Sequence, residues 1–269
     1  MLTPTRKLCE WREPEDIANH LIESFGEPGL IWLDGDGTTR GRWVTLAANP
    51  VEQICARGLP SNLDGSNPFS ILRNLKPGHW TGWLSYEAGA WIEPNNPWKK
   101  DNMATLWIAR HDPVLKFDLK EKKLWIEGCN QKRLKQLSRW LSKIDIDTTS
   151  ERSTKKFKIS LSDWKWITKT KQYSENVESI KNLILQGDIF QANLSACCIG
   201  KKPDHILATH LFQKLRANCP APFSGIIVGD KETLGEAIIS TSPERFLKVL
   251  PNGAIETRPI KGTRPRDKN

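Results

Sequence analysis

The segment SPERFLKVLPNGAIETRPIKGTRPR, residues 242–266, has the clearest pattern in this sequence of 269 residues. Two runs of strand-forming residues, 245–250 and 254–258, flank the tripeptide Pro251-Asn252-Gly253. Such a tripeptide between two apolar runs is typical of a β-hairpin turn. The end of the sequence therefore predicts an antiparallel pair of strands.

Short runs of the same kind occur through much of the sequence, each bounded by Gly, Pro, Asn or Asp. Two lie just before the hairpin and five lie in the N-terminal half: 224–228, 237–240, 30–33, 43–47, 82–86, 104–109 and 124–127. Many short strands separated by turn residues favour large antiparallel sheets.

Helices are predicted at three places. Residues 13–24 have a proline near their start, and residues 203–217 begin with Pro203, which suits the first turn of a helix. Between these two, an amphipathic helix ends at Gly187, and its apolar stripe consists of Tyr173, Val177, Ile180 and Ile184. The segment 189–199 that follows resembles a strand. The sequence thus predicts an α+β fold, an α/β sandwich in which antiparallel sheets pack face to face with helices outside.

The composition and the hydrophobic pattern of the sequence change near its middle. Residues 144–160 are polar and lack hydrophobic periodicity, so we predict a linker at 146–160. It separates an N-terminal region, 1–145, from a second domain, 161–269.

Composition limits the functional classes. The net charge of +9 fits either a solvated surface or a site for an anionic substrate. The basic residues are spread and do not alternate with aromatic residues, so a nucleic-acid partner is disfavoured. Six cysteines lack any CxxC pair and five histidines lack a metal-binding spacing, which favours free thiols in a reducing compartment. No signal peptide or membrane span is recognisable, and we expect a cytoplasmic protein without a membrane partner.

Candidate catalytic residues lie in the terminal hairpin. The predicted pairing brings Glu244 near Lys261, which is followed by Gly262, where backbone can approach a ligand closely. Nearby arginines and desolvation would lower the pKa of Lys261 and make it a better nucleophile. A neighbouring carboxyl could protonate a leaving hydroxyl. The alternative is a cationic strand end at the surface, since structural ion pairs also perturb pKa values.

Four segments, in order, resemble signatures of the chorismate-binding enzymes. They are GDIFQANLS at 187–195, NCPAPF at 218–223, SPERF at 242–246 and TRPIKGTRPR at 257–266. The N-terminal region agrees, because GWLSYE at 82–87 resembles the glycine-aromatic strand of this family. The resemblance implies a fold like that of anthranilate synthase component I.

Within this family, Lys261 resembles the lysine of para-aminobenzoate (aminodeoxychorismate) synthase component I, where anthranilate synthases usually have alanine. The resemblance implies that Lys261 attacks C2 of chorismate while Glu244 assists loss of the 4-hydroxyl. Ammonia then adds at C4, giving 4-amino-4-deoxychorismate for folate biosynthesis. Isochorismate synthases place a lysine where this chain has Gln191, so Gln191 favours ammonia over water. The resemblance also implies substrate contacts from Gln191, Gly262 and Thr263.

Partners follow from the same resemblance. Ammonia would come from a separate glutamine amidotransferase, and Mg²⁺ would be held by glutamates expected beyond Asn269, so no metal ligand is assigned here. The chain corresponds to the first part of the family's catalytic domain, and we expect it to be inactive alone. Anthranilate synthase component I and a non-catalytic remnant remain the alternatives.

A tryptophan pocket is a further expectation. LIES at 21–24 resembles the tryptophan-pocket motif of anthranilate synthase large subunits, which assigns Ser24 and, with it, Pro220. The other interpretation of Ser24 is a helix end that packs against the first sheet.

Overall fold

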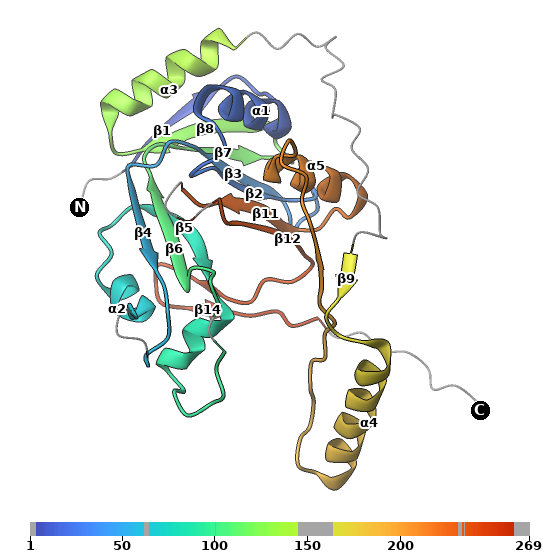
Figure 1. The fold of residues 1–269 in the computed structure, drawn as a ribbon. Helices are drawn as coiled ribbons and strands as arrows, with labels where there is room; N and C mark the ends of the chain where they lie inside the picture. The colour runs from blue at the N-terminus through green and yellow to red at the C-terminus, as the bar shows by residue number, and fades with distance from the viewer. Residues whose placement is uncertain are drawn as a thin grey trace. The chain divides into compact units, whose positions relative to one another are not determined.

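The computed structural model describes residues 4–61, 65–99, 101–144, 164–230, 233 and 235–260. The chain divides into two compact units (Figure 1). The first consists of Met1–Ser150 and Ala208–Asn269, and the second of Glu151–Leu207. The linker predicted at 146–160 and the three residues Lys261, Gly262 and Thr263 lie outside the described residues.

A seven-stranded sheet forms the centre of the first unit. Each pair of neighbouring strands is antiparallel, as the sequence predicts. In spatial order the strands are β1 (Thr5–Cys9), β8 (Lys123–Gly128), β7 (Val114–Asp118), β3 (Trp43–Ala47), β2 (Ile31–Asp34), β11 (Phe223–Val228) and β12 (Ala237–Ser242). The last two strands come from the C-terminal half of the chain, so both halves contribute to one sheet.

A smaller sheet packs against part of the large one. Its three antiparallel strands are β4 (Glu52–Ala56), β6 (Leu106–His111) and β5 (His79–Leu84), accompanied by α2 (Pro68–Arg73) and the 3-10 helix η1 (Tyr86–Trp91). The contact is apolar: Ile31 and Ala47 of the large sheet join Trp83 and Trp107 of the small one in a single buried cluster. The two tryptophan rings are stacked, with centroids 5.0 Å apart.

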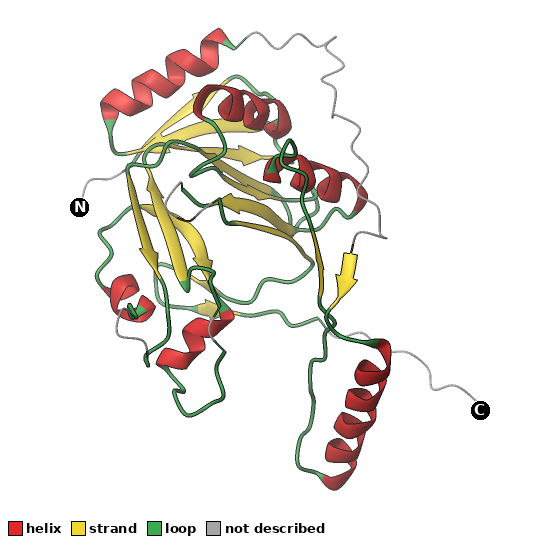
Figure 2. Cartoon of the chain, in the orientation of Figure 1, coloured by secondary structure: helices red, strands yellow, loops and turns green. Residues whose placement is uncertain are grey.

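Three helices cover the other face of the large sheet, as Figure 2 shows in red: α1 (Pro14–Phe25), α3 (Gln131–Lys143) and α5 (Ala208–Asn218). Alternate residues of the strands point to this side, so Trp32 and Leu46 pack under the helices while their neighbours Ile31 and Ala47 face the small sheet. Phe212 of α5 meets Trp32 edge-on at 5.0 Å. The main core therefore lies between the helices and the large sheet.

The first predicted helix is confirmed within a residue at each end by α1. The helix predicted at 203–217 begins later, at Ala208, because a residue distant in sequence caps its start. The carboxylate of Glu27 accepts hydrogen bonds from the backbone of Ala208 at 3.3 Å and of Thr209 at 2.7 Å, and another from the Thr209 hydroxyl.

The second unit contains β9 (Trp164–Trp166), α4 (Thr170–Gln186) and β10 (Cys198–Gly200). Gly187 ends α4 in the left-handed conformation, with φ of 84°, as predicted. The strand predicted at 189–199 is wrong for most of its length, because only the short β10 forms, paired with β9. None of the helices in the described residues is both long and apolar enough to cross a bilayer.

Candidate functional site

The terminal hairpin has the predicted form, although its strands are shorter than expected. β13 (Lys248–Val249) pairs with β14 (Ile255–Glu256), and the turn between them contains Gly253 at a φ of 83°. The hydroxyl of Thr257 donates to the carbonyl of Phe246 at 3.0 Å and so extends the pairing toward the open end of the hairpin. This antiparallel arrangement holds the segment before β13 beside the segment after β14.

Ion pairs brace the same end of the hairpin. Glu256 accepts a hydrogen bond from Arg245 and pairs with Arg258 at 2.9 Å. Burial opposes ionisation of the Glu256 carboxyl, but the hydrogen bonds and charges of both arginines outweigh it and lower the pKa of Glu256. The pair of Arg245 with Glu256 joins the two sides of the hairpin.

Glu244 lies in the loop between β12 and β13 and is half-buried. Ser242 fixes this loop, since its hydroxyl donates to the Glu244 carbonyl at 2.7 Å and lies 3.2 Å from the Glu244 amide. Among the described residues, no cationic side chain pairs with the Glu244 carboxylate within 4.0 Å. The loop therefore orders the backbone of Glu244 and leaves its side chain available for chemistry.

Of the three predicted substrate-binding residues, only Gln191 lies within the described part of the chain. Gln191 belongs to the second unit, where it lies in the irregular segment that follows α4. The proposed nucleophile Lys261, with Gly262 and Thr263, lies outside the described residues.

The two residues assigned to a tryptophan pocket lie on different elements, Ser24 in the last turn of α1 and Pro220 just before β11. Pro220 is exposed just before β11, whose first residues pair with the end of β2 through Ser224 and Asp34. Ser24 lies in the last turn of α1, shortly before Gly29, whose amide donates to the carbonyl of Val228 at the far end of β11. The Ser24 hydroxyl accepts a hydrogen bond from the indole nitrogen of Trp140 at 3.1 Å.

A polar cluster that no sequence pattern predicted lies beside the Pro220 segment. Arg216, in the last turn of α5, pairs with buried Asp34 at the end of β2 and with Glu15 in the first turn of α1 at 2.9 Å. The guanidinium also lies over the ring of Trp32, 5.4 Å from its centroid. The only signal in the sequence was a lone arginine near a helix end, which is too common to identify such a junction.

No metal site is formed by the described residues, which contain no group of three or more histidine, cysteine, aspartate or glutamate side chains able to bind one ion. The Mg²⁺ expected from the family resemblance thus has no ligand set in this part of the chain.

The arrangement of antiparallel sheets covered by helices defines an α+β protein, and comparison with known proteins identifies its class. The model of the chorismate binding enzyme family matches residues 28–269. The chain belongs to the chorismate-binding enzyme family.

Relatives in this family have two kinds of name. An "Anthranilate synthase component I-like protein" of Synechocystis sp. is 32% identical, over 81% of this chain and 43% of the relative. "Aminodeoxychorismate synthase component 1" of Bacillus subtilis is 30% identical, over 70% of this chain and 40% of the relative. "Aminodeoxychorismate synthase" of Streptomyces pristinaespiralis is 27% identical over 87% and 32%. The chain thus spans less than half the length of these relatives.

A solved structure confirms the fold. Anthranilate synthase component I from Streptococcus pneumoniae superposes with a TM-score of 0.54 at 19% identity, covering 78% of this chain and 52% of that one. The expected fold is therefore correct.

Proposed function

We propose that this chain is the N-terminal part of an aminodeoxychorismate synthase component I, which aminates chorismate to 4-amino-4-deoxychorismate. The observation that carries the proposal is the lysine in TRPIKGTRPR, residues 257–266, directly after a hairpin whose opposite strand follows Glu244. The relatives from Bacillus subtilis and Streptomyces pristinaespiralis, both named aminodeoxychorismate synthases, support it.

In the proposed reaction, the amine of Lys261 forms a bond to C2 of chorismate while the bond from C4 to its hydroxyl breaks. Glu244 gives its proton to the leaving hydroxyl, which departs as water. Ammonia then forms a bond to C4 and displaces the Lys261 amine from C2, giving the amino product. The loop position of Glu244 supports this role, because Ser242 holds the Glu244 backbone through two hydrogen bonds.

We propose that ammonia reaches this site from a glutamine amidotransferase subunit, as the resemblance implies. We also propose that the present residues alone do not turn over chorismate, since they span 43% or less of the three curated relatives.

Anthranilate synthase component I is the second candidate. The name of the Synechocystis relative favours it. The two candidates differ in the position of amination and therefore in their products, so one assay separates them.

The test combines chorismate, ammonium and Mg²⁺ with the chain, and with the chain extended by the C-terminal portion of the Bacillus subtilis relative. We expect 4-amino-4-deoxychorismate from the extended chain only, detected by mass spectrometry. Lys261→Ala should reduce its formation at least ~100-fold, because the covalent route is lost. The matched control Lys248→Ala alters an exposed lysine of β13 and should leave the rate unchanged.

Three outcomes would contradict parts of this proposal. Anthranilate as product would assign the second candidate. Turnover by the unextended chain would refute the proposed inactivity. Full activity of Lys261→Ala would remove Lys261 from the mechanism.

A further inference from the structure

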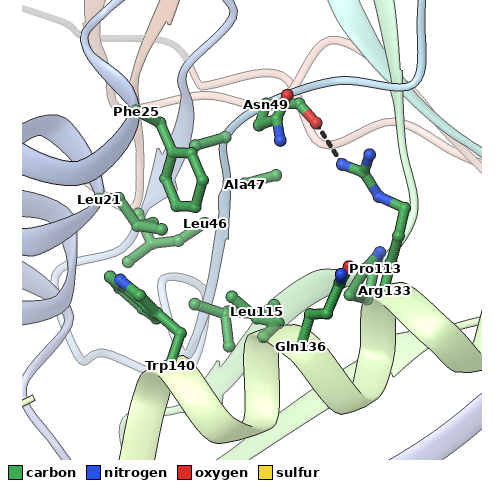
Figure 3. A pocket seen from close by; sticks show the side chains of 12 residues that line it. Leu21, Phe25, Leu46, Ala47, Asn49, Pro113, Leu115, Arg133, Gln136 and Trp140 are labelled. Atoms are coloured by element: carbon green, nitrogen blue, oxygen red, sulfur yellow. Dashed lines mark hydrogen bonds between the residues drawn. The ribbon is translucent and has the colours of Figure 1, made fainter. Parts of the chain in front are cut away.

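A pocket of about 360 Å³ lies between α1, α3 and the ends of β3 and β7 (Figure 3). None of its lining residues comes from the terminal hairpin or from the second unit, so it is a separate feature from the proposed reaction site. Its volume lies in the usual range of small-molecule sites in proteins.

One side of the pocket is apolar. Leu21, Leu46 and Leu115 form buried parts of its wall, each no more than 2% exposed. The rings of Phe25 and Trp140 stand beside them, with centroids 6.1 Å apart and planes tilted by 49°. The hydrogen bond from the Trp140 indole to Ser24 fixes that ring while leaving its face as pocket wall. Such a wall suits a flat apolar group.

The opposite side is polar and carries a positive charge, as Figure 3 shows for Asn49, Arg133 and Gln136. Arg133 donates from Nε to the backbone carbonyl of Asp112 at 2.8 Å and from Nη2 to that of Asn49. Both acceptors are neutral, and within the described ranges no carboxylate pairs with Arg133 within 4.0 Å. Arg42, Arg110 and Arg216, in contrast, each pair with an acid. The charge of Arg133 is thus positioned by the backbone but not neutralised by a carboxylate.

Gln136 adds a second polar group on the same side. It follows Arg133 by one helical turn of α3, so both side chains reach the same side of the pocket. Among the described residues, no hydrogen-bond partner holds its amide. A guanidinium next to a primary amide is a combination that recognises a carboxylate, because each supplies N–H donors to its oxygens.

We propose that this pocket binds a small amphipathic carboxylate, with a flat aromatic body against Phe25 and Trp140 and its carboxylate on Arg133 and Gln136. The flat body accounts for the aromatic wall and the carboxylate for the unneutralised cation. The proposal does not depend on which reaction the family assignment implies.

The test uses 4-fluorobenzoate as the probe, observed by ¹⁹F NMR with the full chain, and 4-fluorobenzamide as its uncharged counterpart. We expect saturable binding of the acid below about 10 mM and at least tenfold weaker binding of the amide. Arg133→Met should weaken binding of the acid at least tenfold. The matched control Arg139→Met changes an exposed arginine of the same helix and should leave binding unchanged.

A second variant keeps the test decisive, because Arg133 also holds two backbone carbonyls and its loss could unfold the region. Leu137→Trp fills the pocket while keeping Arg133, and should abolish binding with a melting curve that shows a folded protein. Equal binding of acid and amide, unchanged binding by folded Arg133→Met or Leu137→Trp, or no binding at all would each overturn the proposal.

Discussion

At the scale of single residues, His111 shows how burial sets a charge state. Its side chain is 1% exposed on β6, and its Nε2 lies 2.9 Å from the carbonyl of Gly29. Burial lowers the pKa of His111 to about 4, against hydrogen bonds that raise it, and the charge of Arg133 lowers it further. The ring is therefore neutral at pH 7, and Nε2 carries the proton that it donates to Gly29.

The stability of the protein should consequently decrease in mild acid. Above about pH 6.5 the histidine is neutral in both states, whereas between pH 6.5 and about 4 only the unfolded chain binds the proton. The free energy of unfolding should fall across this window, by up to about 3 kcal/mol for this residue, and level off below it. Urea unfolding at a series of pH values measures this dependence.

Two variants assign the pH dependence to its source. His111→Gln should flatten the profile between pH 6.5 and 4, although it also lowers stability at pH 7 because the buried contact changes. His205→Gln changes an exposed histidine and should leave the profile as it is. An unaltered slope in the His111 variant would show that other groups cause the acid sensitivity.

At the scale of elements, α3 is the longest of the described helices that the sequence did not predict. Many lysines and arginines lie in this segment and obscure its apolar pattern. Leu134, Leu137 and Leu141 nevertheless recur at helical spacing. Those leucines pack into or against the main core. A count of apolar spacing, made without regard to the charged residues between, would have identified this helix.

The start of α3 depends on a single capping residue. The side chain of Asn130 accepts a hydrogen bond from the amide of Arg133 at 3.1 Å, so it satisfies one of the unpaired N–H groups of the first turn. Asn130→Ala should lower the free energy of unfolding by about 1 kcal/mol. Lys135→Ala, on the exposed face of the helix, should change it by less than about 0.5 kcal/mol. Chemical denaturation compares the two variants, and equal values would argue against a capping role.

The sequence predicted elements well where local signals suffice. Pro14 marks a helix start because proline restricts the backbone angle φ. Gly187 marks a helix end and Gly253 the hairpin turn, because glycine readily adopts a positive φ. It failed where the determining partner is distant. Nothing between residues 203 and 217 reveals that Glu27 caps α5 at Ala208.

For the candidate site, too, the sequence predicted the local features but not the contacts between distant residues. The hairpin and the loop of Glu244 were recognisable from a local pattern, whereas the junction of Arg216 with Asp34 and Glu15 joins three separate elements. Ser24 was assigned from four residues, and the short motif did not reveal that its hydroxyl is already bonded to Trp140. Motifs indicate which residues matter, but their partners require the fold.

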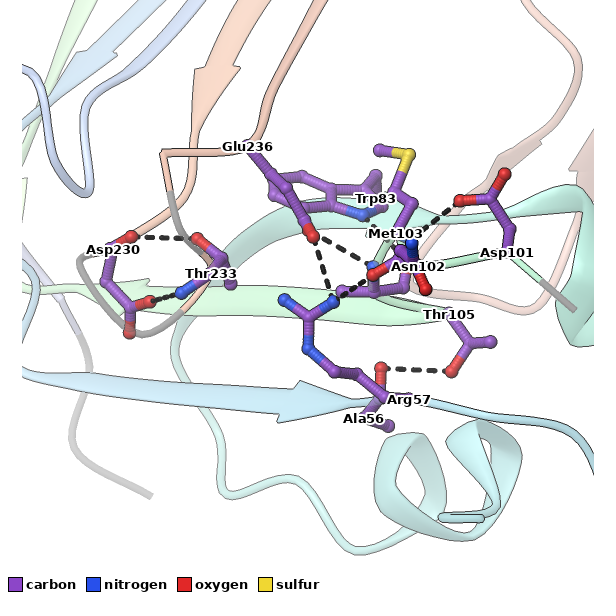
Figure 4. A network of polar contacts seen from close by, with 11 residues as sticks. Ala56, Arg57, Trp83, Asp101, Asn102, Met103, Thr105, Asp230, Thr233 and Glu236 are labelled. Carbon is purple, nitrogen blue, oxygen red and sulfur yellow. Dashed lines mark hydrogen bonds and ion pairs between the residues drawn. The ribbon is translucent and has the colours of Figure 1, made fainter. Parts of the chain in front are cut away.

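At the scale of the whole molecule, the seven-stranded and the three-stranded sheet of the first unit are joined by a polar link as well as by their apolar contact. Glu236, just before β12, accepts from Arg57, just after β4, at 2.9 Å, and from the amide of Ala104 at 3.1 Å (Figure 4). Arg57 also donates to the carbonyl of Asn102. The link connects a C-terminal strand of the large sheet to the small N-terminal sheet, so it spans the two halves of the chain.

This link should contribute measurable coupling between the halves, because Glu236 is 18% exposed and is held by two donors. In a double-mutant cycle with Arg57→Met and Glu236→Gln, we expect a coupling energy of about 1 kcal/mol in the free energy of unfolding. The ion pair of Lys122 with Glu13 has a similar distance, 3.1 Å, but both side chains are 56% exposed, so its cycle should give a coupling near zero. A coupling near zero in both cycles would mean that the apolar cluster alone holds the two sheets together. The expected difference between the cycles would show that the Arg57–Glu236 pair helps to position the C-terminal strands beside the N-terminal sheet.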